Sequence, residues 1–260
     1  MGRAAIARDS SLRLTPSLHI INMETSRSVK ELFLRFCLML AGLYILAQGI
    51  AFTVIANLGT DAITSPALVT HIFSTQAGVE FFTVGRTLIC IHILLVFLQI
   101  AILRSQYKPV QLLQIAMGLL LGLMLDGCMS YTSLLPVPNY AAAIGYTILA
   151  CFVSAFGIFT YVKADMVPLS AEGLCLALSK RFGWNFSRVK VSVDCAMIAL
   201  AVVASLILFG EVVGVREGSL ICAASIGFII GAYFRFFPYW DKLIERSRGI
   251  KTDSDTTHSA

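Results

Sequence analysis

Long apolar runs separated by short polar stretches dominate the pattern of this chain. Six runs contain about 20 residues with few charges, which is the length an α-helix needs to cross the hydrocarbon core of a membrane. They cover residues 32–56, 84–104, 111–133, 140–162, 189–209 and 219–237. The runs are continuously apolar, without the alternation expected of outer-membrane barrel strands, so each is predicted to be a helix that satisfies its own backbone groups.

Composition supports a membrane environment. Hydrophobic residues make up 57% of the chain and charged residues only 13%, whereas soluble domains carry about 25% charged residues. Too few charges are present to cover a soluble globule of this size. The predicted fold class is therefore an all-α polytopic membrane protein with six transmembrane helices.

The positions of the basic residues predict the orientation of these helices. Lys and Arg favour the cytoplasmic side of a membrane, and 18 of the 20 lie at the two termini or in the second and fourth connections. Only Arg86 and Arg216 fall on the other side. We therefore expect a protein of the cytoplasmic (inner) membrane with both termini in the cytoplasm. This distribution accounts for the net charge of +5 without a nucleic-acid partner.

An internal duplication emerges when the chain is aligned with itself at an offset of 105 residues. Each half reads as a long span, a short interrupted segment and two further spans. The predicted organisation is a basic cytoplasmic leader at 1–30, a first membrane repeat at 31–134, a second at 140–237 and a polar cytoplasmic tail at 238–260. Three spans per repeat is an odd number, so the second repeat is expected to enter the membrane inverted relative to the first.

The short segments, 57–83 and 163–188, each contain about 12–16 residues with a helical pattern and begin near Pro66 or Pro168. A helix of that length reaches about half the hydrocarbon thickness. Re-entrant half-helices and interfacial amphipathic helices are both consistent with the pattern. Soluble connecting loops are disfavoured by the apolar residues of the first segment.

Four motifs resemble those of a known family, the YczE/YitT-like family of bacterial integral membrane proteins. They are NLGTDAITSP at 57–66, QLLQ at 111–114 leading to Gly122, FSRVK at 186–190 with Asp194, and GVREGS at 214–219. The resemblance extends over residues 32–237, and the order and spacing of the motifs make it fairly specific. It implies a multi-pass membrane protein and supplies no catalytic residues.

Asp126 is the deepest candidate for chemistry, because a charged group inside a membrane is costly and rare. Gly118, Gly122 and Asp126 recur every four residues on one helix face, and the repeat partners of Gly122 and Asp126 are Gly227 and Gly231. Small residues at this spacing allow close helix packing. Asp126 is therefore expected at a helix–helix contact, either as a coupling or substrate-binding carboxylate or as a structural one paired with Arg86 or a helix terminus.

Glu172 lies in the second short segment. If that segment is re-entrant, Glu172 is buried and becomes a proton-coupling candidate; if it is interfacial, Glu172 is solvated. Asp194 follows Lys190 by four residues, a spacing that favours a structural ion pair over a coupling role.

Three further residues are weaker candidates for substrate or ion coupling. Asp61 precedes the first short segment, where capping the helix is the favoured role. Arg86 is expected to extend to the interface, with pairing to Asp126 or binding of an anionic substrate as the alternative. His92 is more typical of a core histidine than of a proton relay.

Absent motifs narrow the function. The chain has no Walker A motif, no dinucleotide fingerprint and no HExxH or GxSxG motif, so we predict no cofactor and no enzymatic activity. The four histidines are scattered in sequence, and no metal site is predicted.

Inverted repeats with broken helices are typical of secondary transporters. The functional hypothesis is therefore a secondary transporter or exporter of an unknown small solute, coupled to an ion gradient and embedded in the lipid bilayer, as a monomer or as a homo-oligomer. One rival is a non-transporting assembly or regulatory subunit. An intramembrane enzyme is the least favoured alternative.

Overall fold

A computed structural model describes residues 29–236 of the chain, and all regular secondary structure in this part is helical. The first half consists of α1 (Val29–Ala56), α2 (Ser65–Gln76), α3 (Val84–Leu103) and α4 (Leu113–Thr132). The second half consists of α5 (Tyr140–Lys163), α6 (Ser170–Phe182), α7 (Phe186–Phe209) and α8 (Glu217–Phe236). Two short 3₁₀ turns, η2 (Arg104–Gln106) and η3 (Pro109–Leu112), connect α3 to α4.

The six predicted spans are confirmed. Six helices of the described part are long and apolar enough to cross a membrane, namely Val29–Ala56, Val84–Gln106, Pro109–Thr132, Tyr140–Lys163, Phe186–Phe209 and Glu217–Phe236. The protein is therefore a multi-pass membrane protein. The predicted tail, 238–260, and the predicted leader, 1–30, lie outside the described residues, except that Val29 and Lys30 form the first residues of α1.

Local sequence explains where several helices begin and end. The side chains of Thr83, Asn139 and Asn185 accept hydrogen bonds from backbone N–H groups in the first turns of α3, α5 and α7, which satisfies donors that a helix start leaves unpaired. Helices α6 and α7 end at Gly183 and Gly210, both in the left-handed conformation. Glycine adopts this conformation without steric cost.

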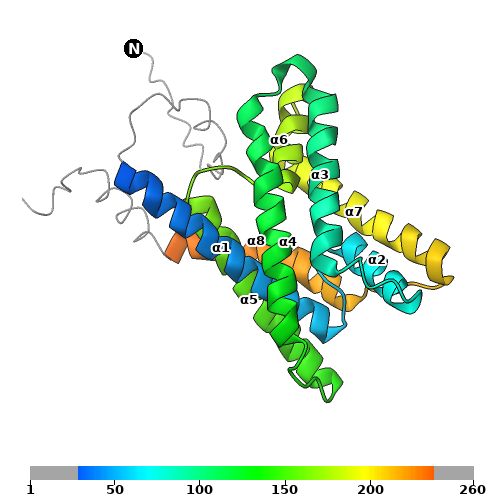
Figure 1. Ribbon diagram of the computed structural model, residues 1–260. Helices are drawn as coiled ribbons and strands as arrows, with labels where there is room; N and C mark the ends of the chain where they lie inside the picture. Colours follow the sequence, from blue (N-terminus) through cyan, green and yellow to red (C-terminus); the bar gives the residue numbers. More distant parts are fainter. Residues whose placement is uncertain (1–28, 237–260) are drawn as a thin grey trace, which may run out of the picture.

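The order of long, short, long and long helices is the same in each half, and most packing pairs also correspond (Figure 1). Helices α1 and α5 lie side by side and antiparallel along most of their length. The pair α1–α4 corresponds to α5–α8, the pair α3–α6 to α2–α7, and the pair α2–α3 to α6–α7. Each short helix therefore packs against a long helix of its own half and one of the other half.

At three glycines, the backbones of α1 and α5 lie closer together than any side chain would allow. A Cβ atom added at Gly42 would lie 2.5 Å from the backbone nitrogen of Tyr161, and one added at Gly157 would lie 2.4 Å from that of Leu46. Gly49 meets Ser154 in the same way. Small residues allow two helix backbones to approach in a membrane. The sequence analysis did not identify these glycines.

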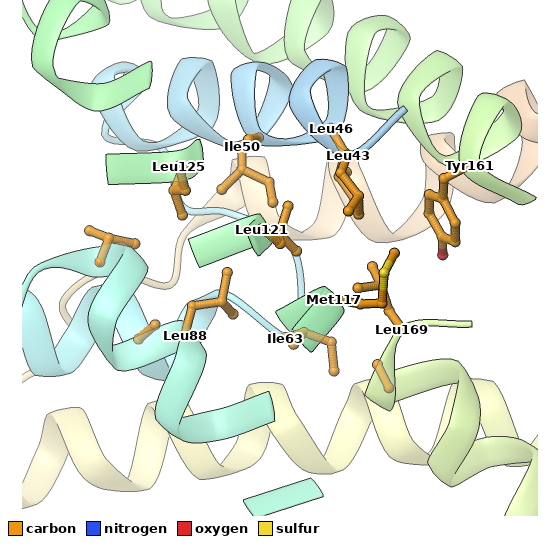
Figure 2. Close-up of a cluster of buried hydrophobic side chains, with 14 of the residues drawn as sticks. Leu43, Leu46, Ile50, Ile63, Leu88, Met117, Leu121, Leu125, Tyr161 and Leu169 are labelled. Atoms are coloured by element: carbon orange, nitrogen blue, oxygen red, sulfur yellow. The ribbon is translucent and has the colours of Figure 1, made fainter. Parts of the chain in front are cut away.

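Apolar side chains from α1 to α7 meet in one core cluster beside this helix pair. Leu43 and Ile50 of α1, Leu88 of α3, and Leu121 and Leu125 of α4 are all buried in this cluster. Leu169, immediately before α6, joins it, and Figure 2 shows these side chains pointing into one shared interior. The core therefore lies between the two halves and holds the start of α6 in place.

The correspondence between the halves fails most clearly at one pair. Helices α3 and α4 pack closely, whereas their counterparts α7 and α8 do not pack against each other to a comparable extent. A Cβ atom at Gly122 would lie 2.6 Å from the Gly85 carbonyl oxygen, and one at Gly118 would lie 2.5 Å from the His92 Cβ. At Gly227 and Gly231 it would meet no described atom within 4 Å. Gly118 and Gly122 therefore lie at a close helix–helix contact, whereas no described residue packs against Gly227 and Gly231; the packing role expected of these four glycines stays a prediction.

Candidate functional site

The first turn of α6 lies inside the protein against α3 and α4. Ser170 is fully buried, and Gly173 brings the α6 backbone close to two amide side chains. A Cβ atom at Gly173 would lie 2.5 Å from Gln114 Oε1 and 2.8 Å from Gln99 Oε1. Only glycine leaves room for both glutamines at this position.

Helix α3 contributes two polar side chains to the same place. His92 Nδ1 and the Ser170 hydroxyl share a hydrogen bond of 2.5 Å, and Gln99 Nε2 donates to the Ser170 carbonyl oxygen at 3.0 Å. His92 and Gln99 are seven residues apart, so they lie on one face of α3. Together with Gln114 of α4, they surround the start of α6. We call His92, Gln99, Gln114 and Ser170 the polar cluster.

The polar cluster has unused hydrogen-bonding capacity. His92 Nε2, Gln99 Oε1 and Gln114 Oε1 are buried and have no hydrogen-bond partner among the described residues, and at most 2% of each side chain is exposed. An unsatisfied buried polar group costs roughly 1–3 kcal/mol. Several such groups converging at one place indicate a site that can hydrogen-bond a polar solute or water.

Glu172 lies in the same turn of α6 as Ser170, on a different face of the helix, with groups of α5 and α7 as its neighbours. One of its carboxylate oxygens, Oε2, is buried without a hydrogen-bond partner among the described residues. Helix α6 is not one of the six spans, and burial there raises the pKa of the Glu172 carboxyl above its usual range, while nearby Lys190 opposes the shift. A carboxyl group with a raised pKa keeps its proton to a higher pH than a solvated one, which makes it a candidate for proton exchange.

Two elements face Glu172. Tyr161 of α5 is buried, and its hydroxyl also lacks a well-aligned partner in the described part of the chain. Figure 2 shows the Tyr161 hydroxyl directed toward the region of Leu169, where α6 begins. From α7, Lys190 Nζ donates to Asp194 Oδ1 at 2.7 Å. The expected ion pair of Lys190 with Asp194 is thus confirmed, and it brings one positive and one negative charge near Glu172.

Asp126 binds a helix terminus instead of Arg86. Its Oδ2 accepts a 2.6 Å hydrogen bond from the Thr83 hydroxyl, and its Oδ1 accepts one of 2.9 Å from the Gly85 backbone N–H. Both donors belong to the start of α3. This geometry matches the structural alternative considered for Asp126. Its coupling role stays a prediction, and Asp126 does not belong to the polar cluster.

Arg86 and Asp61 also lie apart from the polar cluster. The Arg86 guanidinium is exposed, donates to the Phe81 carbonyl oxygen at 3.1 Å and lies over the Phe81 ring. Asp61 does not occupy the N-cap position expected for it, because α2 begins at Ser65 with Thr64 as the N-cap. Its carboxylate instead accepts from the Thr64 backbone N–H at 3.3 Å, one turn earlier.

Sequence reasoning identified only His92 of the polar cluster and missed Ser170 and the two amides, Gln99 and Gln114. A signal was present: Gln99 follows His92 by seven residues, and Gln114 precedes Gly118 by four, so each shares a helix face with a residue that was identified. The other candidates were selected because a charge inside a membrane is costly, and this criterion does not apply to amide side chains, which carry no charge.

A buried ion pair at the start of α1 was also missed. Arg35 Nε donates to Glu31 Oε1 at 2.9 Å, and Arg35 Nη1 donates to the Ala164 carbonyl oxygen at 2.8 Å. The sequence analysis counted Arg35 only as a cytoplasmic charge. In the structure, the hydrogen bond from Arg35 to Ala164 connects α1 to the end of α5.

Comparison with known proteins gives one match. A model of a family of unknown function, DUF6198, matches residues 33–235. No curated protein and no solved structure matches the chain. The match neither names the YczE/YitT-like family nor indicates a bacterial source, so that resemblance stays a prediction. With the matched region covering all eight helices almost completely, the chain belongs to the DUF6198 family of unknown function.

Proposed function

We propose that this membrane protein is a secondary transporter of a small polar solute, with the polar cluster as its substrate site and Glu172 as its coupling carboxyl group. The observation that carries the proposal is a set of buried polar atoms without a hydrogen-bond partner among the described residues, His92 Nε2, Gln99 Oε1 and Gln114 Oε1, around the buried start of α6. Amide and imidazole groups can hydrogen-bond a solute without requiring it to be charged.

The arrangement of the short helices supports this proposal. Helices α2 and α6 have 12 and 13 residues, or roughly 18–20 Å of length at 1.5 Å per residue, about half of a membrane crossing or slightly more. Their first turns are buried and packed between long helices of both halves. Short helices that meet spanning helices inside inverted repeats are the usual setting of transporter substrate sites. We propose that the two halves are such inverted repeats, in the inner membrane with cytoplasmic termini.

Unequal packing of the halves also fits transport. Alternating access requires two similar units to take different conformations around one site. Here α3 and α4 are closed against each other while α7 and α8 are not. A static assembly subunit or an intramembrane enzyme does not require this difference, and we propose neither role.

Uptake into proteoliposomes tests the proposal. Purified protein reconstituted with an inward proton gradient should accumulate one or more members of a panel of small polar metabolites, and a protonophore should abolish the accumulation. The substitution Glu172→Gln should remove gradient-driven accumulation while solute exchange across the vesicle membrane continues. Exchange shows that the variant still folds and binds.

Glu80→Gln is the matched control, because Glu80 is an exposed carboxylate between α2 and α3. It should transport as the unmodified protein does. Absence of movement for the whole panel under proton and sodium gradients, together with a stoichiometric protein partner in mild detergent, would favour the assembly-subunit hypothesis.

Topology tags near His71 and Lys180 should report opposite faces of the membrane, and tags on the same face would contradict the inverted repeats.

A further inference from the structure

An open groove separates the end of α6 from the start of α7, on the surface of the helix bundle. Its volume is about 490 Å³, within the range of small-molecule sites. Trp184, Asn185 and Arg188 line its polar mouth, and Leu178, Val189 and Val193 line its apolar part. The groove is distinct from the polar cluster, whose members do not line it.

The mouth of the groove is positively charged. Arg188 lines it, and Lys180 and Arg181 occupy the last turn of α6 beside it. All three side chains are exposed, and no described residue forms an ion pair with any of them. The groove lining contains no acidic residue. An anionic group would therefore meet unpaired cations there, at moderate desolvation cost.

The groove also lies where a lipid headgroup would be. Helix α7 is a candidate span that begins at Phe186, so its first turn is at the boundary between hydrocarbon and water. The exposed rings of Phe182 and Trp184 stack at 4.8 Å beside the groove. Tryptophan is enriched at this depth. Val189 and Val193 continue along α7 toward the hydrocarbon, as an acyl chain would.

We propose that this groove binds an anionic phospholipid. The lipid phosphate contacts Arg188, the neighbouring Lys180 and Arg181 supply the surrounding positive potential, and one acyl chain lies along Val189 and Val193. Basic pockets between membrane helices recognise anionic headgroups in this way. The apolar part of the groove favours a lipid over a free anion. The unpaired charges favour an anionic lipid over a zwitterionic one.

Lipid binding to the full chain in mild detergent tests this site. Phosphatidylglycerol and phosphatidylcholine with identical acyl chains are titrated against the protein, and bound lipid is counted by native mass spectrometry. Phosphatidylglycerol should bind more tightly. Arg188→Gln should weaken its binding about fivefold, the effect of one basic residue at a membrane surface, and should leave phosphatidylcholine unchanged. Arg188→Lys should restore most of the preference.

Arg104→Gln is the matched control, since it removes the same charge from the exposed connection after α3, and it should bind as the unmodified protein does. Val193→Trp, which fills the apolar part of the groove, should weaken both lipids. Equal affinity for the two lipids, equal losses in Arg188→Gln and Arg104→Gln, or displacement of phosphatidylglycerol by millimolar inorganic phosphate alone would each overturn the assignment.

Discussion

Helices α3 and α4 lie against each other along Gly85, Gly118 and Gly122, whereas the corresponding helices α7 and α8 leave Gly227 and Gly231 uncovered. The same order of elements therefore gives one closed half and one open half. Closure also gathers polar groups: the polar cluster forms where α3 and α4 meet the first turn of α6. Equivalent small-residue faces in the two halves therefore have different packing partners. The internal duplication alone does not determine how tightly the helices of each half pack.

The largest expected effect concerns the ion pairs of the two halves. Arg35 and Glu31 are about 3% exposed, whereas Lys190 and Asp194 are about 30% exposed. Arg35→Met should lower the free energy of unfolding by about 3–5 kcal/mol, because it removes the cation beside a buried carboxylate. Lys190→Met should cost about 1 kcal/mol or less, because water screens the remaining charge. Thermal unfolding in detergent measures both, and equal losses would contradict the difference in burial.

Glycine substitutions test the comparison directly. Gly122→Ala should destabilise the protein by about 1–3 kcal/mol, because its Cβ would press on the Gly85 carbonyl oxygen and the Ile89 side chain. Gly227→Ala should be neutral or stabilising by up to about 1 kcal/mol through helix propensity. Melting curves of the two variants provide the readout. A comparable loss for Gly227→Ala would indicate that the open face has a packing partner.

The proposed substrate site can be compared with the repeat position of one of its residues. Gln114→Leu keeps the volume of the side chain but removes an acceptor beside Gly173, so it should lower the initial transport rate about tenfold, or ~1.4 kcal/mol. The repeat partner of Gln114 is Ser219, which lies beside Gly59 instead. Ser219→Ala should change the rate less than twofold. Initial rates in proteoliposomes are the measurement, and equal losses in the two variants would contradict a substrate site at the polar cluster alone.

Asp126 gives the smallest expected effect. Asp126→Asn keeps one acceptor for the Gly85 N–H and loses the other for the Thr83 hydroxyl, so we expect about 1 kcal/mol lower stability. Gradient-driven transport should persist, since the carboxylate binds the start of α3. Thermal unfolding and uptake are measured on the same preparation. Loss of gradient coupling with solute exchange retained would instead assign the coupling role to Asp126.

Sequence alone determined the six spans, the all-helical class and the position of both short segments, because hydropathy acts within one continuous stretch of chain and hydrocarbon leaves the backbone no other solution. It also placed Gly118 and Gly122 on a packing face and paired Lys190 with Asp194, since both patterns are read within one helix.

Only the tertiary structure decided which faces meet. Gly118 and Gly227 occupy similar apolar helices, yet α3 covers one and no described helix covers the other. Gln99 and Gln114 became a site only when α6 brought Ser170 and Gly173 between them. Helix–helix contacts depend on shape complementarity between segments far apart in the chain, and the local pattern of apolar and polar residues does not contain that information.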